Sequence, residues 1–171
     1  EKLYAQMEAS GAEVLLYGHI CKNESMEVEH RLGENVDFSR ERILELQKVI
    51  LNPAGELLNI APAGTVGKMY LLDFIQKNHL RYIPGIKRMQ DNLYCLYAYQ
   101  CEHKVFYYDY LGYYYRINGD SVCNKYNPDI FGILEKALSE FEAFVVNQAA
   151  NLRPYFCCKV LSVLEREYLH L

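Results

Sequence analysis

The sequence predicts a single α+β domain over residues 1–171, in which an antiparallel sheet is covered by helices. Three observations predict it: a hairpin pattern near the N-terminus, a tyrosine-rich run typical of a three-strand meander, and amphipathic stripes that make the C-terminal third helical. The chain is 51% hydrophobic and 23% charged, which is ordinary globular usage and excludes a disordered or fibrous protein.

Two segments near the N-terminus have the pattern of paired strands. Residues 13–21 are rich in branched and aromatic side chains, and residues 26–32 alternate strictly between apolar or histidine side chains and charged ones. The polar residues 22–25 join the two segments. A β-hairpin with one solvent-facing side is therefore the simplest pairing.

Four segments have the signals of helices. Asp37 or Ser39 is the candidate cap of the first, Thr65 of the second, and Asn127 with the following proline begins the third. Asn52-Pro53 ends the first helix, because the residue before a proline avoids α geometry. The predicted ranges are 38–51, 66–78, 128–150 and 155–169.

The tyrosine-rich run predicts the meander. Residues 92–101 are apolar on both alternating faces, which is typical of a central strand covered on both sides. Residues 104–110 and 113–117 form the other two predicted strands, with turns at Glu102-His103 and Leu111-Gly112. The chain has 16 tyrosines, more than core filling requires, because each buried phenol needs a partner for its hydroxyl.

Exposed tyrosines on this sheet would suit recognition, since their rings offer large and fairly rigid contact area. The first hypothesis is therefore a non-enzymatic, inhibitor-like or adaptor-like domain that binds a protein partner. The alternative is that the tyrosines have no binding role and only cover the core beneath the meander. The predicted binding residues are Tyr107, Tyr108, Asp109, Tyr110, Tyr113, Tyr114 and Tyr115.

A second hypothesis is a small-molecule sensor or a Cys/His-dependent enzyme with a pocket between the sheet and its helices. It would use Cys101, His103 and neighbouring tyrosine hydroxyls. His19-x-Cys21 and Cys101-x-His103 together could supply four zinc ligands, but their spacing matches no known zinc finger. The sequence therefore predicts no catalytic residue, no cofactor and no metal.

Charge and hydropathy indicate whether the chain binds nucleic acid or a membrane. The net charge is −4, and the five cations of residues 61–90 are too few to predict nucleic-acid binding. No apolar run has the length of a membrane span, and the six cysteines are expected to be reduced, which favours a cytoplasmic protein. A homo-oligomer and, because the chain starts at Glu1, a removed signal peptide stay open alternatives.

Overall fold

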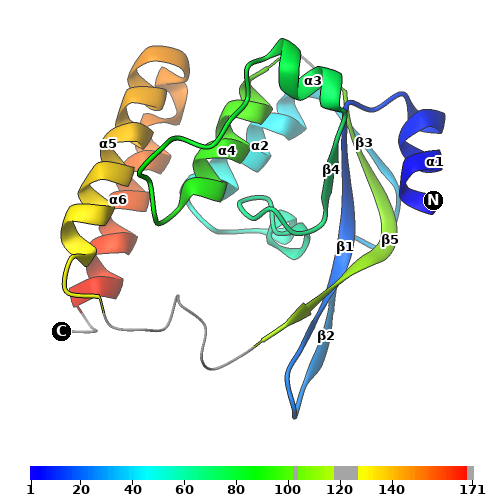
Figure 1. Ribbon diagram of the computed structural model, residues 1–171, viewed down its shortest axis with the longest axis horizontal. Coiled ribbons are helices and arrows are strands. Elements are labelled where there is room, and N and C mark those ends of the chain that lie inside the picture. The colour runs from blue at the N-terminus through cyan, green and yellow to red at the C-terminus, as the bar shows by residue number, and fades with distance from the viewer. Residues whose placement is uncertain (102–103, 118–126, 169–171) are drawn as a thin grey trace.

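The computed structural model describes residues 1–101, 104–117 and 127–168, which form layers of helices around a curled sheet (Figure 1). The helices are α1 (Lys2–Ser10), α2 (Arg40–Leu51), α3 (Leu72–Lys77), α4 (Gln90–Gln100), α5 (Ile130–Gln148) and α6 (Arg153–Tyr168), with 3-10 turns η1 (Glu56–Ile60) and η3 (Ala150–Leu152). The strands are β1 (Val14–Lys22), β2 (Glu27–His30), β3 (Val36–Phe38), β4 (Lys68–Tyr70) and β5 (Val105–Arg116).

The sheet is mixed, so the prediction of a purely antiparallel sheet is wrong, although the α+β class is confirmed. Its order is β2-β1-β5-β3, and β4 also pairs with β1. The central pair, β1 and β5, is parallel, whereas β2 and β4 pair with β1 and β3 pairs with β5 in antiparallel fashion. Parallel neighbours need a long crossover, and here α2, α3 and α4 lie between them in the chain.

The predicted N-terminal hairpin is confirmed. β1 and β2 pair antiparallel with His19 opposite His30. The connecting turn is held by the Asn23 side chain, whose Oδ1 accepts hydrogen bonds from the backbone N–H groups of Ser25 (3.0 Å) and Met26 (2.8 Å). An asparagine that bonds its own backbone two and three residues on is a usual turn former.

The first predicted helix and the helical C-terminal third are also confirmed. α2 begins after Ser39, whose Oγ accepts a hydrogen bond from the N–H of Arg42, and ends at Leu51, before Asn52-Pro53. The predicted helix over 66–78 is wrong in its first half. Tyr17 donates its backbone N–H to the Gly67 carbonyl at 2.8 Å, which draws this segment onto the sheet edge as β4.

The three-strand meander is wrong as well. Residues predicted as its central strand form α4, which contacts α2 and α5. A helix that is apolar all round is stable when it is buried on most sides, and Leu93, Leu96 and Tyr99 are buried in this one. The other two predicted strands are one strand, β5, which runs through Leu111-Gly112. The predicted turn at residues 102–103 lies outside the described residues.

The core lies between the sheet and α2 and α4, with α5 and α6 as an outer layer and α1 on the opposite face of the sheet (Figure 1). Buried side chains of β1, β5, α2, α4 and α5 form one continuous cluster, and each fully buried Leu, Ile or Phe contributes about 1.5–3 kcal/mol. In the described part of the chain, no helix is long and apolar enough to cross a membrane. The five described cysteines carry free thiols.

Candidate functional site

The first turn of α4 presents a carboxylate beside an aromatic wall. The helix begins at Gln90, after Met89 in a left-handed conformation (φ 58°), so Asp91 stands in the first turn. A negative side chain at this end of a helix interacts favourably with the helix dipole. The Tyr82 hydroxyl lies near this carboxylate, whose charge acts on it.

Three tyrosines from separate segments form the aromatic wall. The rings of Tyr82 and Tyr94 stack with centroids 4.9 Å apart, and Tyr70 meets Tyr94 edge to face at 5.6 Å. Tyr82 is 44% exposed, so this wall is open to solvent. Burial, followed by the charge of Asp91, raises the pKa of Tyr82 to about 12, so its hydroxyl is protonated at neutral pH.

Behind this wall, the buried ammonium of Lys68 holds the loop of residues 61–67. Its Nζ donates to the carbonyls of Ala61 (2.7 Å), Gly64 and Val66 (3.4 Å). Burial lowers the pKa of Lys68, whereas the nearby Cys95 and Asp91 raise it. An ammonium has three donors, and the backbone uses them here, so Lys68 orders the loop rather than a ligand.

Cys95 is a structural thiol. Its Sγ lies 3.6 Å from the Gly64 carbonyl, to which it donates, and 3.9 Å from the Tyr70 hydroxyl. Burial raises the pKa of this thiol. Because the thiolate is the reactive form of cysteine, Cys95 is not set up as a nucleophile.

The predicted tyrosine surface is divided by the structure. Tyr107 is fully buried; its hydroxyl accepts from the N–H of Leu32 (3.1 Å) and donates to Asp109 (3.1 Å). Asp109 also accepts from Arg31 and from the N–H of Gly33 (3.0 Å). These two residues therefore fasten β5 to the segment that follows β2.

The other predicted tyrosines lie nearer the surface. Tyr108 and Tyr110 stack with ring centroids 5.6 Å apart, and the ammonium of Lys2 lies over the Tyr110 ring. Tyr113, Tyr114 and Tyr115 are exposed, and the Tyr114 hydroxyl donates to Glu27 at 3.1 Å. Beyond the irregular register of β5 opposite Gly18, Tyr114 alternates with Tyr113 and Tyr115, so it points to the other face of the strand.

The two His/Cys pairs considered as zinc ligands have different outcomes. His103 lies outside the described residues, and the Sγ of Cys101 donates to the Tyr97 carbonyl at 3.3 Å. The other pair, His19 and Cys21, is joined by His30 from the neighbouring strand. Burial, then His30 and Lys68, lowers the pKa of His19 to about 4.

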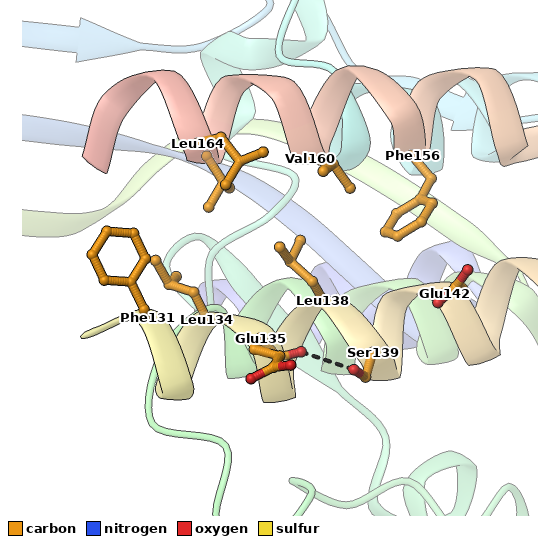
Figure 2. A pocket seen from close by; sticks show the side chains of 10 residues that line it. Phe131, Leu134, Glu135, Leu138, Ser139, Glu142, Phe156, Val160 and Leu164 are labelled. Carbon is orange, nitrogen blue, oxygen red and sulfur yellow. Dashed lines mark hydrogen bonds between the residues drawn. The ribbon is translucent and has the colours of Figure 1, made fainter. Parts of the chain in front are cut away.

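An apolar groove lies between α5 and α6, with a volume of about 460 Å³. Figure 2 shows Phe131, Leu134 and Leu138 of α5 facing Phe156, Val160 and Leu164 of α6. Its polar members, Glu135, Ser139 and Glu142, all come from α5. Apart from these three side chains, the lining of the groove is apolar.

Sequence reasoning missed Asp91, Tyr82 and Tyr94 as a site. With residues 92–101 taken for a strand, Asp91 fell in a loop and nothing singled it out. The available signal was an acidic residue ahead of the apolar run that starts at Leu93, which is typical of the first turn of a helix. Tyr82 and Tyr94 lie only nine and three residues from Asp91 in the chain, but no local pattern singled them out.

Comparison with known proteins identifies a shared fold. No protein-family model matches the sequence, and no curated protein matches it. Solved structures of S. aureus TarS 1-349 superpose with TM-scores of 0.57 for the protein alone, 0.54 for its complex with UDP and 0.60 for its complex with UDP-GlcNAc. Each is 14% identical and is matched over 93% of this chain.

The chain spans about two fifths of the TarS structures, 40% to 42% of their length. This likeness overturns the prediction of a non-enzymatic, adaptor-like binding domain. The fold is shared with a protein whose structures contain UDP and UDP-GlcNAc, whereas the predicted adaptor surface rested on a meander that does not form. The chain therefore shares the fold of part of TarS 1-349.

Proposed function

We propose that this chain is part of a nucleotide-sugar-dependent glycosyltransferase, in which Asp91 is the general base. The observation that carries the proposal is the likeness to the UDP-GlcNAc complex of TarS, with a TM-score of 0.60 over 93% of the chain. Because the chain spans 42% of that structure, the proposal concerns the portion of a site that these residues supply.

The setting of Asp91 fits this chemistry. Transfer of a sugar to a hydroxyl forms a new C–O bond, breaks the bond between the sugar and the nucleoside diphosphate, and releases the hydroxyl proton. A carboxylate within hydrogen-bond reach of that hydroxyl can accept the proton, which typically contributes 10²–10⁴-fold to the rate. Asp91 is partly exposed at the start of a helix, and the Tyr82 hydroxyl lies near it.

The aromatic wall supports the same proposal. The apolar C–H faces of a sugar ring pack well on aromatic rings, and the polar tips of tyrosines can bond its hydroxyls. Tyr82 and Tyr94 present stacked rings next to the carboxylate, and Tyr70 supports them from the side. A sugar held on this wall would lie beside the proposed base.

Isothermal titration calorimetry tests the substrate class. UDP-GlcNAc, UDP and free GlcNAc are titrated separately into the chain in buffer with Mg²⁺, the usual counterion of diphosphates. We expect UDP-GlcNAc and UDP to bind and free GlcNAc to give no heat. A chain that is folded by circular dichroism but binds neither nucleotide would contradict the proposal.

A further inference from the structure

Three side chains with soft or borderline donor atoms gather on one face of the β1–β2 hairpin. His19 and Cys21 are two residues apart on β1, so they point to the same face. His30 lies directly opposite His19 in the antiparallel register. The hairpin therefore brings two imidazoles and one thiol together from two strands.

The donor atoms are close to the separation that a metal requires. One ring nitrogen of each histidine and the Cys21 Sγ lie within 4.8 Å of one another. The imidazole rings are parallel, with centroids 4.7 Å apart. In a tetrahedral zinc site, ligand atoms lie about 3.3–3.6 Å apart, given Zn–N and Zn–S bonds of about 2.0–2.3 Å. Small side-chain rotations would close the difference.

His19 supplies an independent reason to expect a ligand. Its side chain is buried, at 6% exposure, and its Nδ1 has no hydrogen-bond partner among the described residues. A buried polar atom without a partner costs about 1–3 kcal/mol, and a metal bond would remove that cost. Cys21 and His30 are only partly buried, so an ion can reach them from solvent.

We propose that His19, Cys21 and His30 bind one Zn²⁺ ion and leave its fourth position open to water or a small ligand. Imidazole and thiolate donors suit Zn²⁺, whereas Mg²⁺ and Mn²⁺ prefer oxygen donors, which this cluster lacks. Three protein ligands with one open position is the arrangement of reactive zinc sites, while structural sites have four protein ligands. The site shares no residue with the proposed base and does not depend on it.

Zinc binding to the tag-free 171-residue chain tests the proposal. After incubation with Zn²⁺ and dialysis, metal analysis should find about one ion per chain. Co²⁺ in its place should give the near-ultraviolet absorption of a cobalt–thiolate bond. The C21S and H30N variants change the two partly exposed ligands, which limits damage to the fold. Each should weaken zinc binding by more than about 100-fold, because even outer-shell changes cost about 10–100-fold.

Matched controls separate this site from scattered surface binding. Cys157 and His79 are exposed and lie outside the hairpin, so C157S and H79N should bind zinc as the unchanged chain does. Circular dichroism establishes that every variant is folded. The proposal is overturned if the unchanged chain retains no zinc after dialysis, or if folded C21S and H30N retain as much as the controls.

Discussion

Asp91 and Asp109 each lie near a tyrosine hydroxyl, but their surroundings differ. On β5, Asp109 is enclosed by Arg31, by the N–H of Gly33 and by the buried Tyr107. At the start of α4, Asp91 meets Tyr82, whose ring is 44% exposed, in front of an open aromatic wall. A carboxylate saturated by protein donors stabilises the fold, whereas one beside an open wall is available to a ligand.

The pKa of Asp109 reflects this saturation. Burial alone would raise it, but the hydrogen bonds from Arg31, Gly33 and Tyr107 together hold it below its ordinary value. The folded state therefore favours the charged form of Asp109. Its contribution to stability is present above the unfolded-state pKa, about 3.9, and is lost as the pH falls through the lower folded-state pKa.

The largest expected effect on stability concerns Gly67, in the loop near Asp91 that the Lys68 ammonium holds. Gly67 has a φ of +70°, and a Cβ added there would lie 2.5 Å from the Tyr17 carbonyl oxygen. We expect G67A to lower the free energy of unfolding by about 2–4 kcal/mol, from backbone strain and the clash together. Urea denaturation measures this change.

The control makes the same substitution where nothing opposes it. Gly132 lies in α5 with no atom within 4 Å of an added Cβ. G132A should therefore stabilise the chain by about 0.5–1 kcal/mol, the helix preference of alanine over glycine. Equal effects of the two substitutions would contradict the tight approach of β4 to β1.

On the Asp109 side, D109N should lower the free energy of unfolding by about 2–3 kcal/mol at pH 7, because charge-assisted hydrogen bonds are lost. The difference from the unchanged chain should shrink as the pH falls below about 4. D37N is the control: Asp37 pairs with Lys104 at the surface at 3.3 Å, and such pairs are worth about 0–1 kcal/mol. A D109N difference that persists undiminished at pH 3 would argue against the charged form as its source.

The smallest effect compares the two tyrosines directly. Y82F removes a half-exposed hydroxyl, and we expect it to change the free energy of unfolding by less than about 1 kcal/mol. Y107F leaves the partly buried N–H of Leu32 without its acceptor, so a loss of about 1–3 kcal/mol is expected. Thermal melting of both variants measures the two losses of stability. A greater loss in Y82F than in Y107F would contradict a structural role for Tyr107 and an open position for Tyr82.

Local patterns predicted much of the fold. The alternation in residues 26–32 identified β2, and Ser39 with Asn52-Pro53 bounded α2, because these signals act within a few residues. The apolar run at 92–101 has no such clear period. Its tyrosines favour a strand by propensity, but burial against α2 and α5 makes it a helix. Tertiary packing decided the outcome there.

The sites depend on contacts that sequence spacing does not encode. Strand periodicity placed His19 and Cys21 on one face as a candidate pair, but His30 joins it through the register of β2 on β1. Asp91 meets Tyr82 through the path of the segment between α3 and α4. The parallel pairing of β1 with β5 joins strands about 90 residues apart, and no local signal predicts that order.

The most direct test of the roles given to the two aspartates is hydrolysis of UDP-GlcNAc, in which water accepts the sugar and UDP is released, by the unchanged chain, D91N and D73N. Asp73 also lies in the first turn of a helix, α3, so D73N reproduces the helix-dipole effect, about 0.3–1 kcal/mol. We predict that D91N stays folded and releases UDP about 10²–10⁴-fold more slowly, while D73N keeps the rate of the unchanged chain. Release by D91N at the rate of D73N would contradict the assignment of Asp91 as the base.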